Sequence, residues 1–256
     1  MEVGRLNELP LKSVVKMMNE SEQTKSPVLL CIETTAEVCS VALAKGMELI
    51  GEWESEPGRN HAATIGSFAQ KALQSANTAG LKLEAIAVSE GPGSYTGLRI
   101  GASFAKGLAF GCNIPIIAVS TLRSMTDGFT EGLTYTPDAL FCPMIDAGRM
   151  EVYTALYQTN GAVETEEQAM IVDEASFSDL YSQREVYFFG SGAAKCKEVI
   201  KLPNAHFDAY APHARDLRKE VLAAFSKGHF VDTAYWTPNY LKPYIAKKAK
   251  NKVLNR

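Results

Sequence analysis

A glycine-rich segment carries the strongest chemical signal in the sequence. It covers Ser89–Gly101 (SEGPGSYTGLRIG) and joins a predicted strand to a predicted helix. Glycines permit positive φ angles in such a turn, and the hydroxyls of Ser94 and Thr96 can accept hydrogen bonds from the first helical N–H groups. Bare amides at a helix start can also bind an anion. The segment is neither a Walker loop nor a GxGxxG dinucleotide fingerprint. An anion-binding turn and a capped structural turn that needs small residues both stay open.

The residues on either side of this segment predict a regular order of strands and helices. Residues 28–32 form a continuous apolar run, as expected for a strand buried on both faces. Periodicity and turn signals then predict strands at 38–44 and 48–54, a helix at 61–77, a strand at 85–89, a helix at 97–111, a strand at 114–119 and a helix at 121–129.

The second half of the chain repeats that βββαβαβα order. The predicted elements are strands at 139–145, 150–157 and 168–172, a helix at 174–182, a strand at 185–189, a helix at 193–201, a strand at 206–210 and a helix at 216–227. A repeated unit of this kind predicts an α/β protein with two lobes, each a mixed sheet with helices on both faces. The expected organisation is an extension at 1–26, a first lobe at 27–133, a smaller second lobe at 134–236 and a C-terminal segment at 237–256.

Composition and charge limit the class of function. The 256 residues carry a net charge of −3, with 46% hydrophobic and 21% charged residues, which is typical of a globular protein. Residues 242–256 hold six basic and no acidic residues, so the rest of the chain is acidic and a weak candidate for binding nucleic acid alone. A solvated tail and a phosphate-contacting tail are both compatible with that charge.

Location and redox state follow from what the sequence contains. No apolar run approaches the length of a membrane span, and residues 1–26 lack the apolar region of a signal peptide. The five cysteines are odd in number and no pair has CxxC spacing. We therefore expect a cytoplasmic protein without membrane contact, with reduced cysteines that act as small hydrophobic residues.

Five segments, in order, resemble the TsaB (YeaZ) family, glycoprotease-like (peptidase M22-like) proteins of tRNA threonylcarbamoyladenosine biosynthesis. They span most of the chain between residues 27 and 242, and they are Leu30–Thr35 (LCIETT), Gly58–His61 (GRNH), Glu90–Phe110 (close to GPGSFTGLRIG…AKGLA), Ile145–Tyr153 (IDAGRMEVY) and Pro238–Lys242 (PNYLK). The resemblance implies the two-lobed actin-like (ASKHA, RNase H-like) α/β fold, which agrees with the duplicated unit.

The resemblance also implies a role without a catalytic residue. In this family the TsaB protein dimerises with its catalytic paralogue TsaD, the threonylcarbamoyltransferase. Helped by the ATPase TsaE, TsaD modifies the adenosine beside the anticodon of tRNAs that read codons starting with A. The chain is then expected to be a dimerisation scaffold that reaches TsaE and tRNA only through the complex. A homodimer is expected when TsaD is absent.

A metal site is not expected. TsaD proteins bind their metal through a His-x-x-x-His helix, where two imidazoles one turn apart face one ion. Here Ile65 stands one turn after His61, and the remaining histidines share no such spacing. An HExxH motif is also missing from the sequence. These observations argue against metallopeptidase chemistry and favour a helix-start or interface role for His61.

At most a weak or vestigial nucleotide or anion site is expected, with no resident cofactor. Members of the actin-like superfamily hold ATP between their lobes against short turns rich in Asp, Gly and Thr. Here Glu33 replaces the usual Asp, and Arg149 stands where Thr is usual. The candidate residues are Glu33, Thr34, Thr35, Gly91, Gly93, Ser94, Asp146 and Gly148.

The two first-lobe helices are apolar around more of their circumference than a surface helix should be. Residues 61–77 contain one lysine, and residues 97–111 contain one arginine and one lysine. The resemblance places the TsaD contact on these helices. The predicted partner interface comprises His61, Ile65, Phe68, Ala69, Ala72, Leu98, Gly101, Ala105 and Lys106. The alternatives are a glycoprotease-like peptidase, an ATP-dependent enzyme of the same fold, or a self-associating module without a tRNA role.

Overall fold

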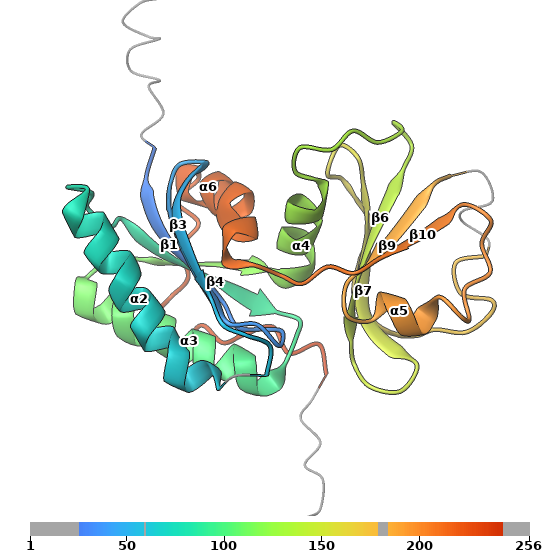
Figure 1. Cartoon of the computed structure of the whole chain (residues 1–256), viewed down its shortest axis with the longest axis horizontal. Helices are drawn as coiled ribbons and strands as arrows, with labels where there is room; N and C mark the ends of the chain where they lie inside the picture. The colour runs from blue at the N-terminus through green and yellow to red at the C-terminus, as the bar shows by residue number, and fades with distance from the viewer. Residues whose placement is uncertain (1–25, 59, 179–183, 243–256) are drawn as a thin grey trace, which may run out of the picture.

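The computed structural model describes residues 26–58, 60–178 and 184–242. The predicted extension at 1–26, apart from Ser26, and the basic residues after Lys242 lie outside these ranges. The described chain forms two lobes, each built around a five-stranded sheet (Figure 1).

The first sheet has the strand order β3-β2-β1-β4-β5. Strand β1 pairs antiparallel with β2 and parallel with β4, so the sheet is mixed. Helices α2 (His61–Thr78) and α3 (Tyr95–Cys112) cover one face. The strands are β1 (Val28–Glu33), β2 (Ser40–Lys45), β3 (Glu48–Glu54), β4 (Ala85–Gly91) and β5 (Ile116–Ser120).

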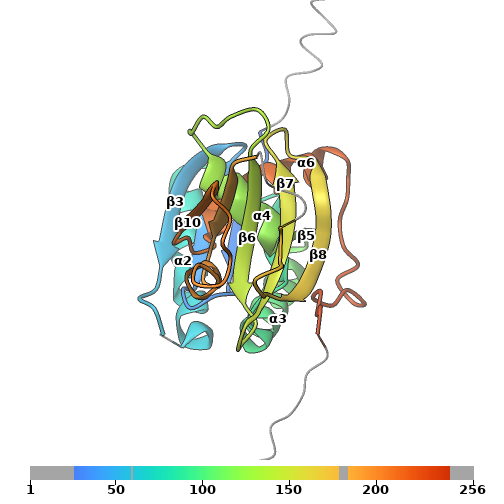
Figure 2. The ribbon, with the colours of Figure 1, turned by 90° about the vertical axis from the view of Figure 1, so that its right-hand side faces the viewer.

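The second sheet repeats this topology, with the order β10-β9-β6-β7-β8 (Figure 2). Strand β6 pairs antiparallel with β7 and parallel with β9, as β1 does with β2 and β4. The predicted two-lobed α/β fold with mixed sheets is confirmed. The strands are β6 (Leu140–Asp146), β7 (Glu151–Gln158), β8 (Val163–Ile171), β9 (Val186–Phe189) and β10 (Ala205–Asp208).

Three elements of the second lobe differ from the sequence prediction. Strand β8 starts at Val163 rather than at 168, because this edge strand carries exposed glutamates that hide it from an apolar pattern. The helix predicted at 174–182 is a turn over its described part, 174–178. There the side chains of Asp173 and Ser176 bond to nearby backbone N–H groups and compete with a helix. Helix α5 is short, at Ala193–Cys196.

The two lobes exchange helices, which the sequence did not predict. Helix α4 (Thr121–Thr130) follows the first sheet, but its Leu122 and Met125 pack against the second sheet. The 3₁₀ turn η1 (Ala214–Leu217) and helix α6 (Arg218–Ser226) follow the second sheet, but they pack against the first. In Figure 1, α4 and α6 both lie between the two sheets. Residues 134–236, predicted as the second lobe, thus include η1 and α6, which pack against the first sheet, just as α4 of the predicted first lobe packs against the second sheet.

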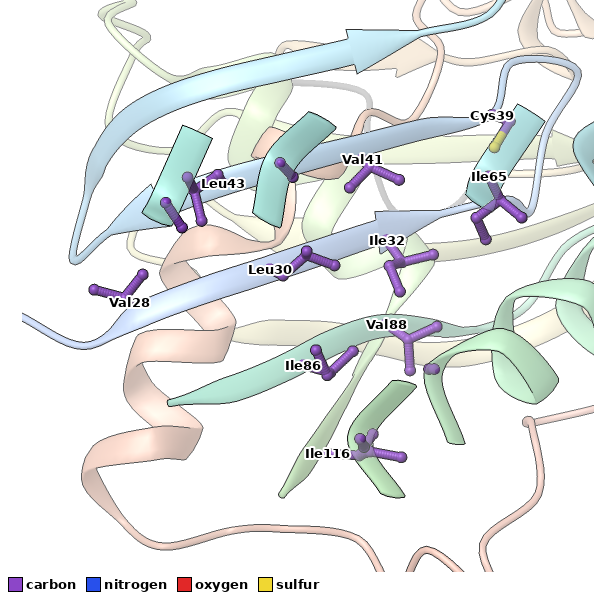
Figure 3. Packing of buried hydrophobic residues seen from close by; sticks show 14 residues of the cluster. Val28, Leu30, Ile32, Cys39, Val41, Leu43, Ile65, Ile86, Val88 and Ile116 are labelled. Carbon is purple, nitrogen blue, oxygen red and sulfur yellow. The ribbon is translucent and has the colours of Figure 1, made fainter. Parts of the chain in front are cut away.

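The continuous apolar run of β1 is explained by cover on both faces. Val28, Leu30 and Ile32 contribute to the core beneath α2 and α3 (Figure 3). Leu29 and Cys31 point to the opposite face, where η1 and α6 lie. Burial raises the pKa of the Cys31 thiol to about 12, so it remains a neutral core group. All five cysteines are free, and Cys112 is the exposed one.

No helix among residues 26–58, 60–178 and 184–242 is both long and apolar enough to cross a membrane.

Asp216 of η1 is a buried acid at the junction of the lobes. Its carboxylate is 4% exposed and accepts hydrogen bonds from the Tyr210 hydroxyl at 3.0 Å and the His213 N–H at 2.9 Å. Gly128 of α4 lies so close that a Cβ built there would overlap with this carboxylate. Burial outweighs these donors and raises the pKa of Asp216 to about 7.

The raised pKa predicts a pH-dependent stability that Asp216→Asn should remove. The folded chain keeps this proton up to about pH 7, whereas the unfolded chain releases it near pH 4. Relative to the variant, the wild-type free energy of unfolding should therefore fall by roughly 1 kcal/mol per pH unit between pH 4.5 and 7, and stay level above. Urea unfolding of both proteins at several pH values measures this difference. A difference independent of pH would contradict the assignment.

Candidate functional site

Glu33 ends β1, at a turn that the sequence predicts as part of a weak or vestigial nucleotide or anion site. The side chain is fully buried, and its Oε1 accepts hydrogen bonds from the N–H and the hydroxyl of Thr35, both at 2.5 Å. The Ser89 hydroxyl donates to Oε2. Burial, acting against these hydrogen bonds, raises the pKa of Glu33. Glu33 is therefore turned into the lobe, where it holds the turn in shape.

The glycine-rich segment packs directly on this turn. The Thr34 hydroxyl donates to the Gly97 carbonyl at 2.8 Å, and the Ser94 N–H donates to the Thr35 carbonyl at 2.8 Å. A Cβ built on Gly97 or Gly101 would overlap with Thr34. The Ser94 hydroxyl accepts from the Gly97 N–H at 3.2 Å and so caps α3. Close approach to β1 is therefore sufficient to explain why glycine occupies these positions.

Asp146 ends β6, the strand that corresponds to β1 in the second lobe. Its Oδ1 accepts from the Gly148 N–H at 2.7 Å and from Lys195 Nζ at 2.5 Å. Partial burial acts to raise the pKa of Asp146, but Lys195 and the Gly148 N–H together lower it. The carboxylate is thus ionised and already paired with an ammonium group. A divalent cation at Asp146 would have to displace Lys195, a partner that sequence reasoning missed.

A cleft of about 850 Å³ separates the two turns. Of the eight predicted residues, five line it: Thr35, Gly93, Ser94, Asp146 and Gly148. Glu33 and Thr34 do not, because they are buried in the first lobe, and Gly91 lies against the carbonyl of Asn239. The cleft is lined by hydroxyls, turn backbone, the acidic residues Glu37 and Asp146, and apolar side chains such as Ile100 and Met125.

His61 lies at the start of α2, on the rim of this cleft. Its Nε2 is 2.8 Å from the Ala36 carbonyl oxygen, and the side chain of Asn60 caps the helix. Ile65, one turn later, is 3% exposed and belongs to the core. The geometry gives His61 a backbone partner and offers no second ligand from the next turn of the helix.

One group of potential metal ligands lies elsewhere, and sequence reasoning missed it. Glu52, Glu54 and His213 bring ligand atoms within 4.8 Å of one another. The Arg215 guanidinium is 2.6 Å from a Glu52 oxygen and 3.5 Å from a Glu54 oxygen. Because Arg215 already supplies positive charge there, this group joins β3 to η1 and carries no argument for a metal.

The predicted interface residues fall into two groups in the structure. His61, Phe68 and Lys106 are half-buried, and Lys106 Nζ donates to the Trp236 carbonyl at 2.6 Å. The other six are buried inside the lobe: Ile65, Ala69, Ala72, Leu98, Gly101 and Ala105. These six side chains pack within the first lobe, although Ile65 also reaches the floor of the groove between α2 and α3.

The outward surface of the two helices has a different set of residues. A groove of about 730 Å³ runs between α2 and α3, lined by Ala62, Ile65, Tyr95, Thr96, Arg99, Ile100, Ser103 and Phe104. Gly66 follows Ala62 by one turn, Gly107 follows Ser103 by one turn, and Gly111 follows Gly107 by another. These three glycines are exposed, and a Cβ built on any of them meets nothing within 4 Å.

These exposed glycines contrast with Gly97 and Gly101. A glycine inside a helix costs about 1 kcal/mol relative to alanine. No contact within the described chain requires glycine at 66, 107 or 111. Together they leave the outer backbone of α2 and α3 bare along the groove. We refer to this surface, the groove with Gly66, Gly107 and Gly111, as the α2–α3 face.

Comparison with known proteins identifies the family. Residues 55–249 match the family model described as TsaD, tRNA N6-adenosine threonylcarbamoyltransferase. The chain is 32% identical to the tRNA threonylcarbamoyladenosine biosynthesis protein TsaB of Escherichia coli, over 86% of this chain and 96% of that protein. The chain belongs to the TsaB (YeaZ) family.

Further relatives agree with this membership. The Bacillus subtilis TsaB protein is 33% identical over 68% of this chain and 75% of its own length. The solved structure of YeaZ from Pseudomonas aeruginosa superposes with a TM-score of 0.71 at 26% identity, covering 84% of this chain and all of the other. The expected family is thus confirmed, and with it membership in a family named for tRNA threonylcarbamoyladenosine biosynthesis.

The two classes of glycine predict opposite effects of the same substitution in one helix. Gly97→Ala should lower the free energy of unfolding by about 2 kcal/mol or more, since the new methyl overlaps with the Thr34 carbonyl. Gly107→Ala should raise it by about 0.5–1 kcal/mol, because the methyl enters open space and favours the helix. Urea unfolding of both variants measures this. Equal effects of the two substitutions would show that the close contact is not what requires glycine.

Proposed function

We propose that this protein is a non-catalytic partner of TsaD in the cytoplasm and acts as a dimerisation scaffold for tRNA threonylcarbamoyladenosine synthesis. TsaE and tRNA are engaged through the complex. The observation that carries the proposal is the α2–α3 face, where glycines that the described chain does not need expose helix backbone beside a groove. In the absence of TsaD, the same face is proposed to pair two copies of the chain.

The chemistry of the α2–α3 face supports helix-to-helix contact. Small residues let another helix pack with its ridges in the groove and its backbone close. Helices α2 and α3 contain Lys71, Arg99 and Lys106 and no acidic residue. Lys106 is already bound to the Trp236 carbonyl. Depletion of charge is typical of the centre of a protein interface.

The cleft supports the non-catalytic part of the proposal. Glu33 is committed to Thr35 and Ser89, and Asp146 is committed to Lys195 and Gly148. Both carboxylates that end corresponding strands therefore serve the fold of their own lobe. The peptidase and ATP-dependent alternatives would each need a free reactive group or a metal at this position.

Gly107→Arg should block the partner while the isolated chain stays folded. Arginine is a better helix former than glycine, and it enters open space in the free protein. Its side chain would separate two closely packed helices, so the affinity for TsaD should fall at least about tenfold, or roughly 1.4 kcal/mol. Isothermal titration or co-purification with TsaD measures the loss.

Two matched variants control this experiment. Gly107→Ala tests the same position without bulk, and Ala223→Arg places the same side chain on an exposed position of α6. We expect Ala223→Arg to bind TsaD as the wild type does. Wild-type affinity of Gly107→Arg would remove the α2–α3 face as the TsaD contact.

Reconstitution tests the function itself. We expect tRNA modification by TsaD, TsaE and the enzyme that supplies the threonylcarbamoyl adenylate to depend on adding this chain. The purified chain alone should produce no modified adenosine. Equal modification without the chain would refute the scaffold role, and peptide cleavage or ATP hydrolysis by the chain alone would favour an enzymatic alternative.

A further inference from the structure

The segment after Val231, residues 232–242, contains the motif Pro238–Lys242, which the α2–α3 face does not explain. We name this segment the C-terminal strap. It starts beside β5, where Val231 bridges to Ile116 at the edge of the first sheet. It ends in contact with the second lobe.

The strap is anchored first on the first lobe. Trp236 packs against the core beneath α2 and α3, and its carbonyl accepts from Lys106 Nζ at 2.6 Å. The Asn239 N–H donates to the Glu90 carbonyl at 2.7 Å. A Cβ built on Gly91 would lie 2.6 Å from the Asn239 carbonyl oxygen. Close contact with the strap is therefore sufficient to explain why residue 91 is glycine. The sequence analysis had predicted Gly91 as part of a possible anion site.

The strap next contacts the groove of the α2–α3 face. The Tyr240 ring lies 4.9 Å from the ring of Tyr95, centroid to centroid. Tyr95 is the first residue of α3 and lines the groove. The Arg99 guanidinium lies 5.6 Å from the centre of the Tyr95 ring. A partner seated in the groove would thus touch the side chain on which the strap rests.

The far end of the strap reaches the second lobe. Lys242 Nζ pairs with a carboxylate oxygen of Glu151, the first residue of β7. The backbone of Glu151 closes the cleft turn, since its N–H donates to the Gly148 carbonyl at 3.1 Å and its carbonyl accepts from the Ala147 N–H at 3.0 Å. Ala147 and Gly148 both line the cleft.

We propose that the C-terminal strap couples the α2–α3 face to the cleft, with Lys242 as a positioning residue. A partner that immobilises Tyr95 and Tyr240 holds Lys242 on Glu151 and so stabilises the turn at Ala147–Glu151. The identity of that partner, TsaD, rests on the proposed function. By linkage, whatever stabilises the turn strengthens partner binding by the same factor.

The Lys242–Glu151 ion pair is weak enough to be broken without unfolding the protein. The two side chains are 35% and 24% exposed, and ion pairs of this exposure add little to global stability. Lys242→Met should therefore leave the chain folded while it loosens the turn slightly. The neighbouring Lys195 Nζ still donates to the Glu151 carbonyl at 2.7 Å, so the turn keeps its internal support.

Hydrogen exchange of the full chain tests the link in two arms. In the free protein, Lys242→Met should speed exchange of the Ala147 and Glu151 amides about threefold and leave β1 unchanged. With TsaD added, the wild-type turn should become about threefold slower to exchange, and this protection should be absent in Lys242→Met. Lys242→Arg should restore the wild-type behaviour. Lys201→Met, an exposed lysine of the second lobe, should match the wild type.

The outcomes separate this inference from the proposed function. Unchanged exchange of the turn in free Lys242→Met would overturn the strap, whatever TsaD does. If TsaD binds and protects the turn equally in the wild type and Lys242→Met, the coupling is wrong while the partner proposal stands. If TsaD fails to bind the wild type, the proposed function fails, and the free-protein arm still decides whether Lys242 holds the turn.

Discussion

The exchange of helices between the lobes is the constraint on which the rest of the structure depends. Each sheet needs apolar cover on both faces, and each obtains one face of that cover from the helix that follows the other sheet. Arg218 of α6, itself 7% exposed, joins the lobes by donating to the carboxylate of Glu131, just after α4, and to the Met47 carbonyl. The two walls of the cleft are consequently held by shared packing rather than by a single connecting segment.

The two carboxylates at the cleft serve to hold its walls in shape. At the ends of β1 and β6 the fold places a carboxylate in equivalent positions, Glu33 and Asp146. One is buried against hydroxyl and amide donors, and the other is paired with Lys195. Each therefore stabilises its own turn. The fold that creates the cleft has thus tied both of these carboxylates to internal partners, and this supports the proposal that the protein acts through a surface.

The sequence was sufficient to predict the positions of most helices and strands. It was not sufficient to predict which side of each helix is buried. Apolar runs located β1 and its two-sided burial, and the repeated order located both sheets, because these depend on local pattern. Strand β8 was predicted too short, because an exposed edge strand has no alternation of apolar and polar residues to detect. Six of the nine predicted interface residues are buried within the first lobe, and the sequence did not indicate this because α2 and α3 are nearly uncharged and no polar face marks which stripe meets the sheet. Three further features could not be predicted because they join residues far apart in the sequence and no local pattern marks them. They are the helix exchange, the pairing of Lys195 with Asp146 and the contact of Lys242 with Glu151.

Glycine shows most clearly what the structure adds to the sequence. In α3, Gly97 and Gly107 look equivalent in the sequence, and both weaken a helix relative to alanine. At Gly97 that cost is offset by a close contact with Thr34, whereas at Gly107 the described chain provides no contact that offsets it. An exposed helix glycine that no internal contact requires supports our proposal that this surface meets a partner. The α2–α3 face has three such glycines, and the strap leads from its groove to the cleft, which is lined by family motifs from both lobes.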